Sequence, residues 1–185
     1  MSLCLVANWK LNGSREFNHQ WIREFSKNSN GQNLSSLGIA PASLYIGHLK
    51  GIIGDLGIKI GAQNIDLEET GARTGEISAS MIKDLGCKFS IIGHSERRIF
   101  FHETNQIICK KLIQANNQSV IPILCIGESA EENQSNNTNN VLEQQIIEAL
   151  EGANELSSLI IAYEPVWAIG SGKTPNPEEI NSVHE

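Results

Sequence analysis

Short apolar runs alternate with longer amphipathic segments along the whole chain. The runs lack polar alternation, which is typical of parallel strands buried on both faces. Six are predicted as strands: Leu3–Ala7, Leu37–Ala40, Ile58–Ala62, Phe89–Ile92, Val120–Ile126 and Leu159–Tyr163. Between them, apolar residues recur at helical spacing and predict one buried face on each helix, as at Phe17, Trp21 and Phe25; Ile108, Leu112 and Ala115; and Leu142, Ile146 and Ala149.

Two helix starts carry capping signals. Ser129 and Glu132 form a capping-box pattern, and Pro177 follows Asn176 at the first position of a predicted helix, with Glu179 after it. The stretch Ser129–Asn140 is rich in Asn, Gln and Glu, so we expect a solvated loop and a helix start there.

The alternation gives six β/α units in one domain spanning residues 1–185, with the sixth helix only begun at the end. Such alternation predicts a parallel sheet with helical crossovers. Two architectures fit it, an open doubly wound sheet and a closed barrel of eight β/α units. The pattern alone does not choose between them.

Composition narrows the class of protein. Hydrophobic residues make up 40% and charged residues 19% of the chain, a balance that excludes wholesale disorder. The formal net charge is -7, which argues against a general nucleic-acid binder. An anionic substrate would therefore need local groups, such as glycine amides, helix N-termini or a few placed cations.

The N-terminus has no basic region before its short apolar run, so no signal peptide is predicted, and no stretch is long enough to span a membrane. The cysteines show no Cys-x-x-Cys spacing, so we expect neither a zinc site nor a disulfide framework. Reduced thiols in the cytoplasm are the default interpretation for Cys4, Cys87, Cys109 and Cys125.

Polar residues whose side chains could take part in catalysis or binding follow the apolar runs directly. In a parallel sheet all carboxyl-terminal strand ends lie on one side, where α/β enzymes place their sites. We therefore expect these residues to converge: Asn8, Lys10, Gln63, Asn64, His94, Ser95, Glu96, Gly127, Glu128 and Glu164.

Glu164 has the chemistry of a general base, although a strand-end Glu is by itself most often a surface residue. His94 precedes a predicted helix start, where its neutral form is favoured and could donate to a developing oxyanion. Lys10 could bind an anion or stay solvated. Arg97 and Arg98 are expected to form structural ion pairs.

The segment from Pro165 to Thr174 resembles the end of a phosphate-binding P-loop at Gly172, but Trp167 stands where that motif requires glycine. An apolar tip between Pro165 and a Gly-Ser-Gly hinge better fits an active-site lid whose glycine amides close over a phosphate.

These residues also form longer motifs. Asn8-Trp9-Lys10, Gly93-His94-Ser95-Glu96-Arg97-Arg98, Cys125-Ile126-Gly127-Glu128 and Ala162-Tyr163-Glu164-Pro165-Val166-Trp167-Ala168-Ile169-Gly170 resemble the triosephosphate isomerase family in order and placement. The loop from Gln63-Asn64 to Thr70-Gly71-Ala72-Arg73-Thr74-Gly75-Glu76 is similar too. The resemblance runs from residue 5 to the end of the chain and implies a (β/α)8 barrel, of which this sequence holds the first six units.

The resemblance implies interconversion of dihydroxyacetone phosphate and D-glyceraldehyde 3-phosphate through an enediolate, in glycolysis and gluconeogenesis, without metal or organic cofactor. Glu164 would move the proton between the two carbons and His94 would donate to the two substrate oxygens, the division of roles known for the family. Lys10 would neutralise charge, and Asn8 would bind a substrate oxygen.

The resemblance also implies supporting roles. Glu96 would pair with Lys10, and Ser95 and Cys125 would support the base. Pro165, Trp167, Gly170 and Ser171 would form the lid and phosphate contact. Thr74, on the loop that begins at Gln63 and Asn64, would reach into a second subunit, so a cytoplasmic homodimer is expected, with no nucleic-acid or membrane partner.

A complete barrel of this type needs about 250 residues, so strands seven and eight are missing from this sequence. We expect the polypeptide to continue beyond Glu185. A truncated, non-catalytic fragment and a second chain that supplies the missing units are the alternatives. A nucleotide or phosphate-ester binder on an open sheet is a further, weaker hypothesis that rests on Gly172-Lys173-Thr174.

Overall fold

The computed structural model describes residues 5–29, 32, 34–153 and 155–185. Leu3 and Cys4, at the start of the first predicted strand, lie outside these residues. Within them the strands are parallel: β1 (Leu5–Asn8), β2 (Leu37–Ala40), β3 (Lys59–Ile60), β4 (Phe89–Ile92), β5 (Ile121–Ile126) and β6 (Ile160–Tyr163). All six predicted runs therefore contain a strand.

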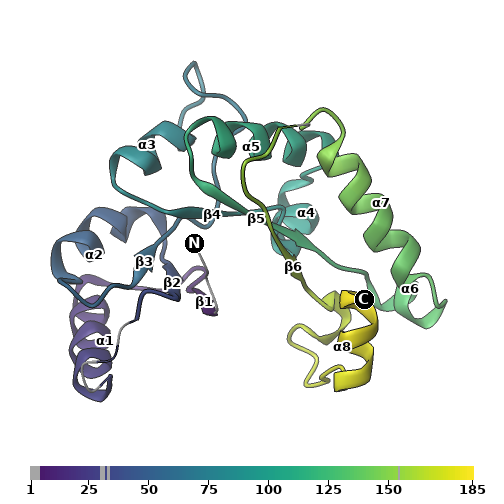
Figure 1. Ribbon diagram of the computed structural model, residues 1–185, viewed down its shortest axis with the longest axis horizontal. Coiled ribbons are helices and arrows are strands. Elements are labelled where there is room, and N and C mark those ends of the chain that lie inside the picture. Colours follow the sequence, from purple (N-terminus) through teal and green to yellow (C-terminus); the bar gives the residue numbers. More distant parts are fainter. Residues whose placement is uncertain (1–4, 30–31, 33, 154) are drawn as a thin grey trace.

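The strands follow chain order across the sheet. β1-β2-β3 and β4-β5-β6 are each hydrogen-bonded, and a parallel bridge between Ala62 and Ser90 joins the two groups. The strands curve into an arc whose outer side carries the helices (Figure 1). β1 and β6 form the two edges of the arc, and no pairing joins them among the described residues.

The helices are α1 (Arg15–Asn28), α2 (Ile46–Ile52), α3 (Ala79–Asp84), α4 (Ser95–Phe101), α5 (Asn105–Asn117), α6 (Ala130–Gln134), α7 (Thr138–Leu150) and α8 (Pro177–His184), with short 3-10 helices at Ser43–Tyr45 and Val166–Ala168. The capping box predicted at Ser129 is confirmed for α6, and the predicted N-cap Asn176 of α8 is confirmed and forms a capping box with Glu179. The polar stretch 129–140 holds α6 and the start of α7. No described helix has the length and apolar character needed to cross a membrane.

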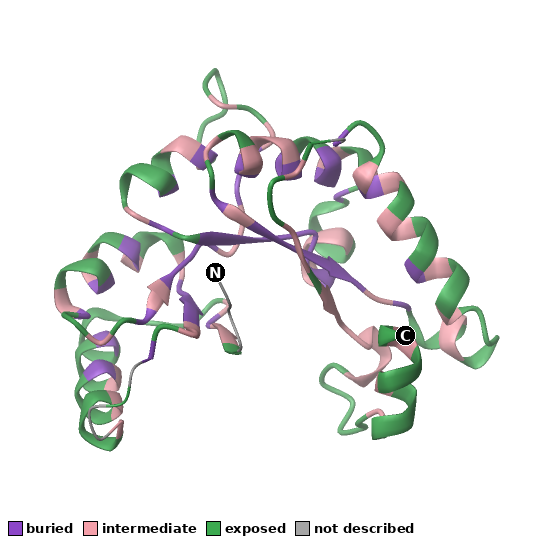
Figure 2. Cartoon of the chain, viewed as in Figure 1, coloured by how far each residue is buried: buried purple, intermediate pink, exposed green. Residues whose placement is uncertain are grey.

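The core lies in two layers, and its most buried strands are β2, β4 and β5, whereas β1 and β6 are only partly buried (Figure 2). The larger layer fills the space between sheet and helices and includes Leu49, Ile108 and Leu112. The smaller lies on the concave face of the sheet and contains Ala40, Phe89, Ile91, Ile123 and Cys125.

One close approach fixes the inner layer. A side-chain Cβ at Gly61 would lie 2.4 Å from the Phe89 ring, so only glycine leaves room for that ring. The predicted stripe of α1 packs its Trp21 ring edge-on to Trp9, with centroids 5.4 Å apart, which fixes the chain just after β1.

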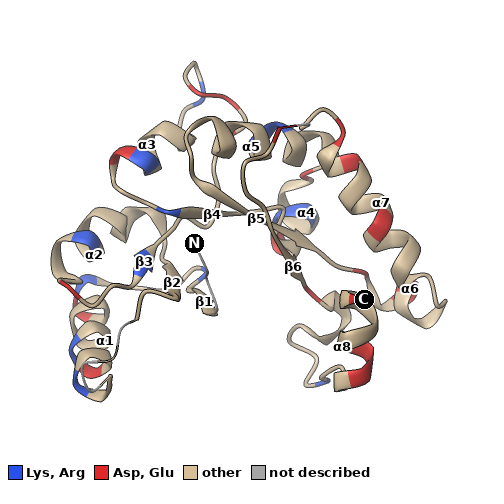
Figure 3. Ribbon diagram, viewed as in Figure 1, with Lys and Arg blue, Asp and Glu red and all other residues tan. Residues whose placement is uncertain are grey.

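Acidic side chains lie along α7 and at the start of α8 (Figure 3). They include Glu143 and Glu148 on α7 and Glu178 and Glu179 on α8, whereas α7 carries no Lys or Arg. Part of the acidic excess of the chain therefore sits on α7 and α8.

Candidate active site

His94 and Glu164 lie side by side although they are far apart in the sequence. His94 is at the start of a helix, and Glu164 follows the end of a strand. His94 follows β4 and is the N-cap of α4, whose Glu96 amide donates to its Nδ1 at 3.2 Å. Nδ1 is therefore the acceptor nitrogen, and Nε2 carries the proton. Nε2 lies 2.8 Å from Oε1 of Glu164, so the imidazole donates to the carboxylate.

The carboxylate is held in a charged form that suits a base. Burial by itself raises the pKa of Glu164, but hydrogen bonds from His94 and from the Ser95 amide to Oε2, at 2.9 Å, outweigh it and bring the pKa below its ordinary value. Only 17% of the side chain is exposed. Glu164 is thus ionised and largely shielded from water.

Cys125 lies behind this pair on β5 and is 3% exposed. Burial, followed by the neighbouring Glu164 charge, raises the pKa of its thiol far above the ordinary range. Cys125 therefore remains a neutral thiol beside the carboxylate and adds no competing charge.

Lys10 brings an ammonium group to the side of His94. Its Nζ lies 2.9 Å from Oε1 of Glu96, and both side chains are about two-fifths exposed. The Lys10 backbone has φ 49°, a left-handed conformation that is costly for lysine. Oδ1 of Asn8 accepts the Lys10 amide at 2.9 Å and so supports that conformation.

Gln63 fixes the same backbone from the other side. Its Nε2 donates to the carbonyls of Lys10 and Ala40, each at 2.9 Å. The structure places Gln63 beneath Lys10 rather than on the projecting part of the loop that follows β3. The only sequence signal for this role of Gln63 is that it is a polar residue directly after a predicted strand.

Asn64 belongs to a buried ionic network instead. Its Oδ1 accepts Nζ of Lys111 at 2.8 Å, and Lys111 also binds Glu103, which pairs with Arg97 at 2.5 Å. The expectation of a structural ion pair is therefore confirmed for Arg97. It is wrong for Arg98, which binds two backbone carbonyls and an amide and forms no ion pair with a described carboxylate.

An open cleft of about 500 Å³ lies beside these groups. Its polar lining includes Asn8, Lys10, His94 and Glu96, and Phe100 and Phe101 form an apolar rim. Glu164 is on the far side of the His94 ring and borders a separate pocket of about 180 Å³. Imidazole, ammonium and carboxamide therefore face one cleft, with the base directly behind the imidazole.

The predicted lid continues from Glu164. Pro165 precedes the short helix Val166–Ala168, and the chain then turns at Gly170, whose φ is 70°. Trp167 donates from Nε1 to the buried Oε1 of Glu128 at 2.8 Å. Gly170 and Ser171 are exposed and line neither pocket, so their predicted contact with a phosphate stays a prediction.

Thr74 is exposed on the loop between β3 and α3, which projects beyond the helices (Figure 1). Arg73, the residue before Thr74, forms an ion pair of 2.6 Å with the buried Asp66 nearer the start of the loop. Burial raises the pKa of Asp66, but hydrogen bonds from Glu68 and Arg73 outweigh it and lower the pKa overall. The loop thus presents Thr74 on a braced support.

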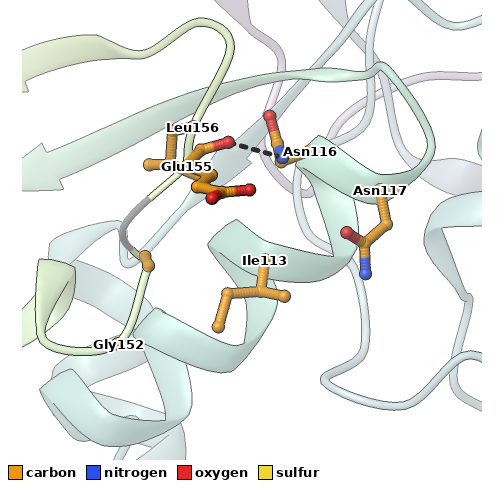
Figure 4. A pocket seen from close by; sticks show the side chains of 7 residues that line it. Ile113, Asn116, Asn117, Gly152, Glu155 and Leu156 are labelled. Carbon is orange, nitrogen blue, oxygen red and sulfur yellow. Dashed lines mark hydrogen bonds between the residues drawn. The ribbon is translucent and has the colours of Figure 1, made fainter.

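Other cavities lack this chemistry. A pocket of about 350 Å³ lies at the end of α5, where Asn116 donates to the Glu155 carbonyl at 3.1 Å (Figure 4). Ile113 and Leu156 line it, and none of the candidate residues does. Within the described part of the chain, no three His, Cys, Asp or Glu residues gather in a group that could hold a metal ion.

The profile of the family described as triosephosphate isomerase matches residues 3–185. The chain belongs to the triosephosphate isomerase family. It is 41% identical over 182 residues to the triosephosphate isomerase of Nitrosococcus oceani, covering 97% of this chain and 73% of the relative. It is 43% identical over 183 residues to those of Escherichia coli O1:K1 and Shigella boydii serotype 18, covering 98% of this chain and 72% of each relative.

Membership of the triosephosphate isomerase family decides between the two architectures that the sequence pattern left open. The arc of parallel strands is the first six β/α units of a (β/α)8 barrel, and the protein is an isomerase by family. The His94–Glu164 pair lies at the carboxyl ends of the strands, the face on which barrel enzymes carry their active sites.

Proposed function

We propose that the protein interconverts dihydroxyacetone phosphate and D-glyceraldehyde 3-phosphate by proton transfer between adjacent carbons. The observation that carries the proposal is the hydrogen bond of 2.8 Å between His94 Nε2 and Glu164 Oε1. It joins a shielded, ionised carboxylate to an imidazole. The protonated nitrogen of that imidazole can donate a hydrogen bond to a substrate oxygen. This combination suits the removal of a proton beside a carbonyl group.

Each residue has a defined part in the proposed reaction. Glu164 leaves its resting contacts with His94 and Ser95 and takes a proton from the carbon next to the carbonyl. The freed Nε2–H of His94 then donates to the oxygen on which negative charge develops. The former carbonyl oxygen takes that proton from His94, and His94 recovers a proton from the second oxygen, the former hydroxyl, which becomes the new carbonyl. Glu164 returns its proton to the neighbouring carbon.

Lys10 and the lid supply electrostatics and water exclusion. The Lys10 ammonium, oriented by Glu96 at 2.9 Å, offsets the charge of the phosphate and the enediolate. Asn8 contributes an amide to the substrate oxygen, and the Gly170 amide closes on the phosphate with Ser171. Excluding water protects the enediolate intermediate from side reactions.

A coupled assay on the full-length protein tests the proposal. We expect isomerisation in both directions, with Glu164→Asp lowering kcat about a hundredfold because the carboxylate is withdrawn by roughly one bond length. Arg23→Gln on the exposed face of α1 serves as a control outside the cleft. An active Glu164→Asp enzyme with wild-type kcat would exclude Glu164 as the base.

We also propose a homodimer in which the Thr74 loop of one subunit enters the cleft of the other. Large exposed apolar side chains surround that cleft: Leu11 is 98%, Phe100 71% and Phe101 63% exposed. Such a cluster is typical of an interface. Thr74→Arg should give monomers in sedimentation experiments, whereas Thr70→Arg on the same loop tests whether any added charge has this effect.

We place the reaction in glycolysis and gluconeogenesis in the cytoplasm. The scattered cysteines support this location, because Cys87, Cys109 and Cys125 are buried free thiols, as a reducing compartment maintains them. Fractionation of cells followed by the same assay tests it, and activity confined to a secreted fraction would contradict it.

A further inference from the structure

Arg98 makes three hydrogen bonds that the isomerase proposal does not use. It lies on α4 one turn after His94. Its Nε donates to the Gly93 carbonyl at 2.8 Å, Nη2 to the Cys125 carbonyl at 3.1 Å and Nη1 to Oδ1 of Asn105 at 2.6 Å. The guanidinium of the half-buried Arg98 pairs with no described carboxylate, and backbone and amide oxygens take that place.

The two carbonyls belong to the point where β4 and β5 part. Their pairing ends at Ile92 and Leu124, and the chain turns away at Gly93, whose φ is 71°. The next carbonyl of each strand, on Gly93 and on Cys125, points toward the guanidinium of Arg98 and not toward the neighbouring strand. The planar fork of an arginine can bridge two acceptors at once, which the single ammonium of a lysine does less well.

This bridge joins the two backbone segments that hold His94 and Glu164 in place. Gly93 directly precedes His94. Cys125 directly precedes Ile126, whose carbonyl accepts the Glu164 amide at 2.7 Å. The distance between the two bridged carbonyls therefore sets the distance between the backbones that carry the imidazole and the carboxylate.

A second set of contacts orients the guanidinium. Nδ2 of Asn105 donates to Glu148 on α7 at 2.8 Å, and Gln144 donates to the other oxygen of Glu148 at 2.6 Å. Asn105 thus links the guanidinium of Arg98 to the carboxylate of Glu148, and the two charged groups form no direct ion pair. The geometry of Arg98 is thereby fixed from α5 and α7 as well as from α4.

We propose that Arg98 is a positioning residue for the isomerase reaction: by bridging the Gly93 and Cys125 carbonyls, it holds His94 at donating distance from Glu164 and from the substrate oxygen. The inference rests on the proposed function. Arg98 does not face the 500 Å³ cleft, so its effect on turnover acts through the two residues that it spaces.

The first test replaces Arg98 in the full-length protein by lysine and by alanine. Arg98→Lys keeps the charge but loses the bridge, so we expect kcat to fall about 10- to 100-fold, as for a small misplacement of reacting groups, with KM within about threefold. Lys110→Gln, which removes a charge from the exposed face of α5, should leave kcat at the wild-type value.

A second test uses chemical rescue. The pocket of about 180 Å³ beside Arg98 is open to solvent, so ethylguanidinium can enter the space left in Arg98→Ala. We expect ethylguanidinium, at concentrations far below those that unfold proteins, to restore at least about a tenth of the lost kcat. Ethylammonium at the same concentration should not, because it cannot bridge two carbonyls.

The proton NMR signal of His94 Nε2–H provides a readout that does not depend on turnover. In Arg98→Lys the signal should move upfield as the bond to Glu164 lengthens. Wild-type kcat in Arg98→Lys, or an unmoved His94 signal, would overturn the inference. If Arg98→Ala does not fold, Asn105→Ala, which releases only Nη1, should move the signal in the same direction, and an unmoved signal overturns the inference equally.

The two proposals fail in different ways. A wild-type protein without isomerase activity, but with a His94 signal that shifts in Arg98→Lys, would contradict the proposed function and support the positioning role. An active wild type whose Arg98 variants keep the wild-type kcat and His94 signal would support the proposed function and contradict the positioning role.

Discussion

Trp167 on the lid donates its indole N–H to Oε1 of Glu128, a carboxylate with no exposed surface. The same oxygen accepts the Tyr163 hydroxyl at 3.0 Å and Nδ2 of Asn133 at 3.1 Å. Three donors from three elements therefore share one buried oxygen. The conformation of the lid is thus tied to α6 and to the end of β6 through a single carboxylate.

Trp167→Phe should release the lid without unfolding the barrel. Hydrogen bonds to charged groups contribute roughly 1.5–3 kcal/mol, and Glu128 retains two of its three donors. We expect faster amide hydrogen exchange over residues 165–172 and a lower kcat/KM. Trp21→Phe, which changes an indole on α1, should leave exchange in that segment unaltered. Equal exchange in both variants would mean that Glu128 does not restrain the lid.

Gly127→Ala should damage the site through the backbone alone. An added Cβ would lie 1.9 Å from the Glu164 carbonyl oxygen, so one of the two strand ends must shift. A shift of this size displaces the base, and we expect kcat to fall about a hundredfold. Gly47→Ala on α2 is the matched control.

The space around Gly47 is empty within 4 Å, and its place in a helix makes alanine neutral or stabilising by about 0.5–1 kcal/mol. Steady-state kinetics and thermal unfolding of both variants check the prediction. Normal turnover in Gly127→Ala would show that the loop after β5 can move without carrying Glu164 with it.

Gln63→Met should weaken substrate binding more than it slows chemistry. It removes the two hydrogen bonds that hold the carbonyls of Lys10 and Ala40 while keeping nearly the same side-chain volume. We expect KM to rise because the strained Lys10 backbone relaxes, with a loss of about 1–3 kcal/mol in the free energy of unfolding. Gln20→Met on the surface of α1 is the control, and an unchanged KM in Gln63→Met would contradict the role.

The sequence predicted the strands and the convergence of His94 with Glu164, because buried parallel strands leave a clear apolar pattern and place their polar ends together. It also predicted the capping box at Ser129 and the N-cap at Asn176. It could not predict the role of Gln63, since a carboxamide after a strand looks alike whether it points outward or beneath a loop. The expectation for Arg98 failed for a related reason: its acceptors are backbone carbonyls, which no residue type reveals.

The α1–α2 contact should be sensitive to acid. Nδ1 of His48 lies 3.2 Å from the side-chain amide of the fully buried Asn18, and the His19 ring is 5.0 Å from that of His48. Burial, then His19 and Arg15, lower the pKa of His48 from its ordinary value of 6.5. The unfolded chain therefore binds this proton more readily, and stability should fall as the pH drops below about 6.5.

His48→Gln should flatten this part of the stability profile, since the glutamine side chain does not titrate. Urea unfolding of both proteins between pH 7.5 and pH 5 checks the prediction. Parallel curves for wild type and His48→Gln would assign the acid sensitivity to other groups.

Glu164 should titrate below an ordinary glutamate. Burial opposes ionisation, but the hydrogen bonds from His94 and Ser95 prevail and lower its pKa from the ordinary value of 4.5. The stabilisation that these bonds provide is complete above the unfolded-state pKa and is lost as the pH falls through the folded-state pKa. Carboxyl ¹³C NMR, with Glu164→Gln for assignment, measures the midpoint directly, which kinetics cannot do cleanly because phosphate monoesters titrate near pH 6.

His94→Phe gives the decisive comparison for this titration. The variant keeps the burial of Glu164 and the Ser95 amide but removes the largest contribution that lowers the pKa. Desolvation should then dominate, and the midpoint should move upward past the wild-type value, so that part of the base becomes protonated nearer neutral pH. A midpoint that stays in place would mean that the Ser95 amide alone keeps the carboxylate charged, and that the short contact with His94 is a consequence of packing rather than the source of the ionised base.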